Sequence, residues 1–184
     1  FLWEGGTPSG SFYLHDEHWY ASNKVELRLG VRTTAIDLRA GALRLASGEA
    51  VQADRILLAT GGAARRLPLP GAEAANVHHL RTLGDAAGLA ADLRPGAQIV
   101  IIGMGVIGAE VAASARRMGC NVTAVEPFAS PMIRALGDHF GAWLGEHHRM
   151  QGVRALYGRS VKGLRLSGAK VCAVELDDGE ELAC

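Results

Sequence analysis

The run from Ala97 to Glu110, AQIVIIGMGVIGAE, constrains the fold of this chain more than any other stretch. Its apolar residues Ile99 to Ile102 are typical of a parallel strand that is buried on both faces. Three glycines follow with the spacing G-x-G-x-x-G, at Gly103, Gly105 and Gly108. In such a unit the glycines permit the tight turn, the approach of phosphate and close helix packing, while the helix N-terminus directs N–H groups at the phosphate. The run therefore predicts a dinucleotide-binding strand, turn and helix.

An acidic residue follows at the spacing that such a unit uses. A helix that ends near Gly119 and a second strand at 121–125 lead to Glu126. The motif places an acid about 20 residues after its first glycine, where the carboxylate bonds the adenosine ribose hydroxyls. Because a carboxylate accepts from these hydroxyls and repels a 2′-phosphate, Glu126 predicts NAD(H). The alternative is an ordinary glycine turn with a solvated Glu126.

Composition limits the classes of partner. The 184 residues, 48% of them hydrophobic, suit one domain, or one domain and part of another. The formal net charge of zero argues against nucleic acid and anionic membranes, and no apolar run approaches the roughly 18 residues of a membrane span. Cys120, Cys172 and Cys184 include no C-x-x-C, which predicts a reducing, cytoplasmic setting without zinc. The histidines lack metal-ligand spacing, so we expect no metal site.

The order of predicted elements changes at the proline-rich segment 65–71. Before it we expect a helix at 15–22, strands at 25–29, 31–36 and 42–45, and a buried strand at 54–60. Beyond it we expect a strand at 77–80, a capping box at Thr82–Asp85 that opens a helix to about Leu93, the glycine unit, a helix at 138–150, and short strands from 153 onward. Phe140, Trp143, Leu144 and His147 share one face of the helix at 138–150. The chain is predicted to be α/β, with a Rossmann-like three-layer domain built from a parallel sheet and an antiparallel β-meander.

Three segments together resemble one family of enzymes. They are 56–67 (ILLATGGAARRL), 79–86 (HLRTLGDA) and 103–113 (GMGVIGAEVAA). In this order they resemble the NADH-dependent ferredoxin and rubredoxin reductases, FAD flavoproteins of the pyridine nucleotide-disulfide oxidoreductase superfamily. The resemblance implies that residues 1–69 are the second part of an FAD domain and that residues 70–184 are an NAD(H) domain without its last strand. It also implies an internal fragment of a longer protein.

The resemblance implies an activity for the intact protein. Hydride would pass from NADH to FAD, and electrons would pass from the flavin to a ferredoxin or rubredoxin. Other parts of the FAD site would lie outside this chain, so we expect that the chain alone does not retain FAD and is inactive. No residue is expected to act as a catalytic acid or base. A cut sheet edge near Cys184 leads us to expect pairing with a second copy.

Individual roles follow from the motif and the resemblance. Glu110 would lie near the nicotinamide, and Thr60 and Gly61 would form a short loop against FAD. Arg134 would reach a phosphate or the adenine. Each residue has a structural alternative. Glu110 would be an acid that the helix dipole favours near the helix N-terminus, Thr60 and Gly61 would be a strand end and its turn, and Arg134 would be a solvated arginine. The predicted cofactor-binding residues are Gly103, Gly105, Val106, Ile107, Gly108, Glu110, Glu126, Arg134, Thr60 and Gly61.

Other flavoproteins and one other class of protein remain as alternatives. NADH oxidases, nitrite reductase flavoproteins and coenzyme A disulfide reductases have similar middle segments, and an upstream redox cysteine would identify them. Thioredoxin reductase-like enzymes place C-x-x-C just before this glycine motif, and residues 61–96 hold no cysteine. The alternative from another class is an NAD-binding module without turnover.

Overall fold

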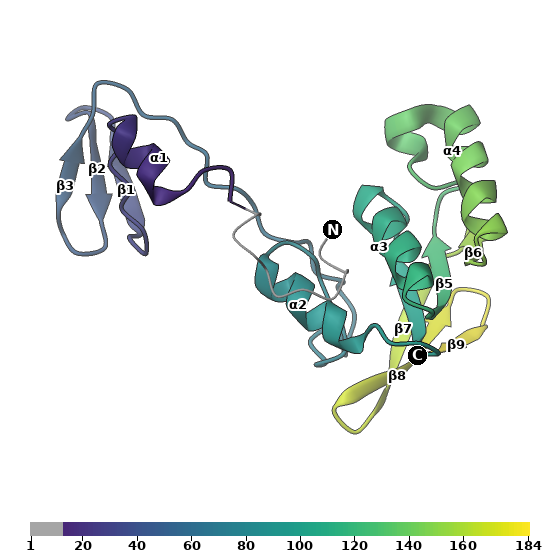
Figure 1. The fold of residues 1–184 in the computed structure, drawn as a ribbon. Helices are drawn as coiled ribbons and strands as arrows, with labels where there is room; N and C mark the ends of the chain where they lie inside the picture. The colour runs from purple at the N-terminus through teal and green to yellow at the C-terminus, as the bar shows by residue number, and fades with distance from the viewer. Residues whose placement is uncertain (1–12) are drawn as a thin grey trace. The chain divides into compact units, whose positions relative to one another are not determined.

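The computed structural model describes residues 13–184, and its contacts divide them into two compact units, one that ends at Gly62 and one from Ala63 onward. Figure 1 shows the elements of each unit. Residues 1–12, which the predicted domain 1–69 includes, lie outside the described part. The assignment of residues 1–69 and 70–184 to an FAD domain and an NAD domain stays a prediction.

The first unit contains one short helix and one small sheet. Helix α1, Glu17–Ser22, begins at Asp16, whose carboxylate accepts a hydrogen bond from the backbone N–H of Trp19 at 2.8 Å. The strands β1 (Thr33–Asp37), β2 (Ala42–Leu45) and β3 (Ala50–Gln52) form an antiparallel sheet in that order. Helix α1 and strands β1 and β2 agree with the helix and the strands expected at 15–22, 31–36 and 42–45.

Three predicted strands do not form, at 25–29, 54–60 and 77–80. Leu57 and Leu58, which were expected to be buried, are 89% and 64% exposed. Apolar residues form a strand only where a neighbouring strand satisfies their backbone N–H and C=O groups. No strand among the described residues pairs with these three segments. The prediction from apolar pattern alone was therefore wrong at these positions.

The second unit begins with helices and parallel strands in alternation. Helix α2 (Leu83–Asp92) starts in the predicted capping box, where the side chains of Thr82 and Asp85 each accept from the other residue's backbone N–H. Next come β4 (Gln98–Ile102), α3 (Val106–Arg117), β5 (Asn121–Glu126), α4 (Ile133–Met150) and β6 (Arg154–Tyr157). The strands form a parallel sheet in the order β4-β5-β6, which aligns the carboxyl ends of β5 and β6.

Packing on the two faces of this sheet produces three layers. On one face Val122 and Ala124 of β5 pack with the small residues Ala112 and Ala115 of α3. On the other face Val125 packs with residues of an antiparallel meander. The meander consists of β7 (Val161–Ser167), β8 (Lys170–Leu176) and β9 (Glu181–Ala183). Alternate residues of a strand point to opposite faces of its sheet, so β5 packs against α3 on one face and against the meander on the other. This arrangement confirms the predicted three-layer α/β fold.

Helix α4 starts earlier than predicted, and its aromatic face is exposed. It begins at Ile133, five residues early, and is kinked at Gly137, which has φ +76°. The buried face holds Gly141, Gly145 and His148, whereas Phe140 and Trp143 are 47% and 57% exposed. Glycines allow the helix backbone to lie close to its neighbours, since a Cβ at Gly145 would lie 2.9 Å from the Tyr157 ring. The aromatic face that the sequence indicated exists, but it faces solvent.

Candidate functional site

The glycine turn at residues 103–105 joins β4 to α3 and is held against β5. Gly103 has φ +94°, a left-handed conformation that favours glycine. Its N–H donates to the carbonyl of Val125 at 2.8 Å. Gly105 is the N-cap residue of α3 and provides no side-chain capping bond. The first N–H groups of this helix are therefore open to an anion, which the helix dipole favours at this end.

The other two motif glycines occupy different surroundings. A Cβ at Gly108 would lie 1.9 Å from the carbonyl oxygen of Gly103, so only glycine lets α3 approach the turn. A Cβ at Gly105 would meet nothing within 4 Å, and φ there is −70°. The open space above Gly105 is what a backbone that receives a pyrophosphate requires. The geometry at Gly108 fits the predicted packing role, and the phosphate-approach role of Gly105 stays a prediction.

Glu126 ends β5 directly beside this turn. It is only 7% exposed. Its Oε2 accepts from the N–H of Met104 at 2.6 Å, and its Oε1 accepts from the N–H of Phe128 at 3.1 Å. A buried carboxylate is tolerated where hydrogen bonds replace its lost hydration. The two amides therefore orient the carboxylate between the glycine turn and the loop that follows β5.

Met104 is a residue of this site that sequence reasoning missed. Its side chain is fully buried in the core that lines α3, and its carbonyl accepts from the N–H of Met132 at 3.0 Å. Met132 has φ +52° and precedes α4. The apolar residue between the first two glycines is the available sequence signal, because it anchors a turn whose backbone must stay exposed.

The remaining predicted residues on α3 and beyond lie at the rim of the turn. Val106 and Ile107 are 56% and 55% exposed in the first turn of α3, and Glu110 is exposed one turn later. The guanidinium of Arg134 lies 5.9 Å from the centre of the Phe128 ring, which places this arginine against the loop after Glu126. The structure thus brings these residues and Glu126 to one end of the parallel sheet.

Thr60 and Gly61 belong to the first unit. Both are exposed in a segment without regular secondary structure, and Gly61 has φ +69°. Their predicted contact with FAD stays a prediction.

Three features of the described residues bear on other kinds of chemistry. Between residues 13 and 184, no three His, Cys, Asp or Glu side chains gather so as to hold a metal ion. None of the helices in that range combines the length and hydropathy that crossing a bilayer requires. Cys120 is buried, and burial raises the pKa of its thiol.

Known proteins similar to this chain share one family. The model of the pyridine nucleotide-disulphide oxidoreductase family matches residues 8–184. The ferredoxin–NAD(+) reductase component of a biphenyl dioxygenase system from Paraburkholderia xenovorans is 39% identical over 91% of this chain and 41% of its own length. Rhodocoxin reductase from Rhodococcus erythropolis is 34% identical over 92% of this chain and 40% of its own length. The chain thus spans about two fifths of these relatives.

Solved structures agree with these relatives. A ferredoxin reductase from Rhodopseudomonas palustris matches with a TM-score of 0.92 and 33% identity, over 100% of this chain and 45% of that one. The covalent complex of putidaredoxin reductase with putidaredoxin matches with a TM-score of 0.91 and 34% identity, over the same shares.

Proposed function

Because the chain belongs to the pyridine nucleotide-disulphide oxidoreductase family, we propose that it carries the NADH-binding unit of an FAD-dependent reductase. In the whole protein, electrons from NADH pass through the flavin to a ferredoxin or rubredoxin. The names of the relatives support a ferredoxin as the acceptor, since they include ferredoxin–NAD(+) reductase components. The observation that carries the proposal is the buried carboxylate of Glu126, held by backbone amides beside an uncapped helix N-terminus.

The glycine turn and α3 bind the pyrophosphate in this proposal. The free N–H groups at Val106 and Ile107 donate to phosphate oxygens, and the absence of a side chain at Gly105 leaves room for them. The exposed side chain of Glu110 lies one turn along α3, where it would help to orient the nicotinamide.

Glu126 selects the nucleotide through its remaining hydrogen-bonding capacity. An ionised carboxylate offers about four lone-pair sites. The amides of Met104 and Phe128 each use one oxygen, so both oxygens keep a further site for the adenosine ribose hydroxyls. A 2′-phosphate in the same place would meet the negative charge at short range. We therefore propose NADH, and not NADPH, as the donor.

The flavin, when bound, supplies the chemistry that converts a hydride into single electrons. The chain's own residues bind and orient, and none is assigned as an acid or a base. Thr60 and Gly61 would contact FAD from the first unit. The described residues provide no other predicted FAD contact, so we propose that this chain alone does not retain the flavin.

Titration of the purified chain with NADH and NADPH tests the nucleotide assignment. We expect Glu126→Ala to weaken NADH binding strongly and not to weaken NADPH binding, because the variant loses both an acceptor for the ribose hydroxyls and the negative charge that repels a 2′-phosphate. The matched control is Glu181→Ala, an exposed glutamate on β9. Equal losses for both nucleotides in Glu126→Ala would contradict the ribose assignment.

A further inference from the structure

Arg159 lies beside the strand end that carries Glu126. It follows β6, whose Tyr157 pairs with Glu126 in the parallel register. The N–H of Arg159 donates to the carbonyl of Glu126 at 3.2 Å, and the N–H of Gly158 donates to the carbonyl of Phe128 at 2.9 Å. An arginine is therefore attached by its backbone to the same loop as the acid proposed to select the nucleotide.

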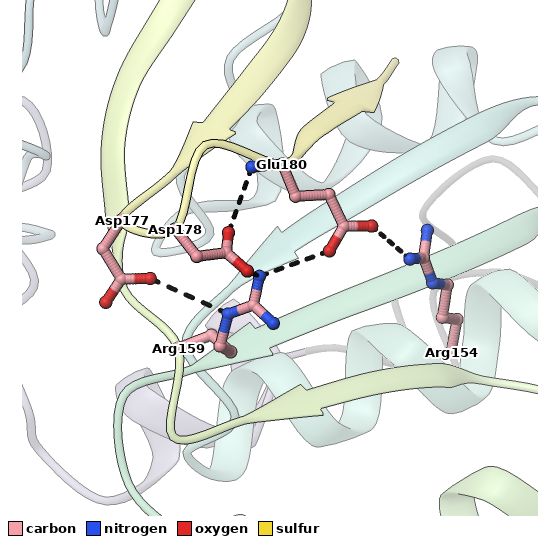
Figure 2. A network of polar contacts seen from close by, with 5 residues as sticks. All are labelled: Arg154, Arg159, Asp177, Asp178 and Glu180. Atoms are coloured by element: carbon pink, nitrogen blue, oxygen red, sulfur yellow. Dashed lines mark hydrogen bonds and ion pairs between the residues drawn. The ribbon is translucent and has the colours of Figure 1, made fainter.

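The guanidinium of Arg159 is engaged by the acidic turn between β8 and β9, residues 177–180 (Figure 2). Its Nη2 contacts the carboxylates of Asp178 and of Glu180, the latter at 3.3 Å, and its Nε lies 3.8 Å from Asp177. Arg154 pairs with the other oxygen of Glu180. The backbone N–H of Glu180 donates to Asp178 at 3.0 Å, which fixes the shape of the turn.

The charges in this cluster favour the ionised forms. The Glu180 amide, together with Arg159, holds the pKa of Asp178 below its usual range. The hydrogen bond that Arg159 donates to Asp178 in turn raises the pKa of Arg159. Three carboxylates face two arginines, so the cluster carries one excess negative charge. An approaching phosphate therefore meets no available cation here.

Sites that accept NADPH usually supply an arginine near the acid position, which binds the 2′-phosphate with charge-assisted hydrogen bonds. Arg159 has the chemistry and the backbone position for that role, but its guanidinium is paired. We propose that the acidic turn determines nucleotide specificity by pairing Arg159, so that this arginine does not serve a 2′-phosphate. The inference rests on the proposed NADH site and assigns it a second selective element besides Glu126.

Neutral, isosteric substitutions in the acidic turn test this inference. In the double variant D178N/E180Q, Arg159 loses its two nearest carboxylates while the turn keeps its backbone bonds from Gly179 to Leu176 and from Leu176 to Glu180. We expect the ratio of the NADPH to the NADH dissociation constant to fall by about tenfold, the worth of one charge-assisted contact. Far-UV circular dichroism checks folding, and the single variant D178N replaces the double variant if the latter unfolds.

Two further variants separate specificity from structure. The control E181Q breaks the pair between Glu181 of β9 and Arg165 of β7, 2.9 Å apart in the same meander, and we expect it to leave the ratio unchanged. Adding R159Q to the double variant should abolish the gain in NADPH affinity.

An unchanged ratio in a folded double variant that still binds NADH would overturn the inference, as would a gain that survives R159Q. Failure of the unaltered chain to bind NADH would instead overturn the proposed function, and this inference with it.

Discussion

Alanine at Gly108 tests whether close packing of α3 on the glycine turn maintains the site. The new Cβ would lie 1.9 Å from the carbonyl oxygen of Gly103, and real Cβ contacts under 3.0 Å essentially do not occur. The obstacle is backbone that is itself bonded to Val125 at 2.8 Å. Turn and helix must therefore separate by about 1 Å. That movement draws the Met104 amide away from Glu126.

The size of the effect follows from two opposing contributions. Overpacking a tight site costs about 1–3 kcal/mol, and a rigid backbone obstacle places Gly108→Ala near the upper end. Alanine recovers about 1 kcal/mol of helix propensity. We expect the free energy of unfolding to fall by about 2 kcal/mol, or the melting temperature by about 4–8 °C for a chain of this size. Urea denaturation followed by far-UV circular dichroism measures the change.

Gly105→Ala is the matched control, since it adds the same methyl group two residues from the turn's start. Its Cβ meets nothing within 4 Å, and its φ of −70° suits alanine. We expect a loss of at most about 1 kcal/mol, from the poorer N-cap. NADH binding should nevertheless fail, because the methyl group occupies the pyrophosphate approach. Wild-type stability and NADH affinity in Gly108→Ala would refute this reasoning, as would unimpaired NADH binding by Gly105→Ala.

Two further predictions concern the folded unit around the site. Burial, with the nearby His147, lowers the pKa of His148, so the unfolded chain binds the proton more readily. The free energy of unfolding therefore has its full value above the ordinary histidine pKa and falls as the pH drops from 7 to 5. His148→Gln should reduce that fall in urea titrations at the two pH values, and an unaltered fall would exclude this histidine. Asn76 bridges to both backbone groups of Val171, at 2.8 and 3.0 Å. Asn76→Ala should therefore cost about 1–3 kcal/mol in thermal unfolding, and no change would show that water replaces the amide.

The elements that the sequence predicted well are those that depend on nearby residues. The capping box of α2 forms as expected, because Thr82 and Asp85 satisfy each other's N–H groups within one turn. Strands β7, β8 and β9, which lie in the region of strands predicted from 153 onward, also form, since they pair in chain order, β7 with β8 and β8 with β9. The apolar segment 54–60 has the composition of a buried strand, but pairing is a property of two strands. Its own residues contain no information on whether the second strand is present.

In helix α4 the aromatic face follows the helical period but is not the buried face. Phe140 and Trp143 share the face that the sequence indicated, and both are exposed. Gly141 and Gly145 instead face the core, where their lack of a side chain brings the helix backbone against Pro131 and Tyr157. Hydrophobicity scales give glycine little weight. The close approach that glycine permits is visible only once the neighbouring loop is placed.

The candidate site also contains some residues that local sequence predicts and others whose contacts depend on distant parts of the chain. The glycines and Glu126 were predictable because the motif describes a local path of the backbone, and a strand end must follow that path within a fixed number of residues. The contacts of Arg159 were not predictable, because they need the register of β6 against β5 and the turn between β8 and β9. In the proposed function, the glycine motif therefore indicates where the dinucleotide binds. In the proposal for Arg159, the choice between NADH and NADPH depends also on charges at Arg159 and in the turn 177–180, which lie 33 to 54 positions after Glu126.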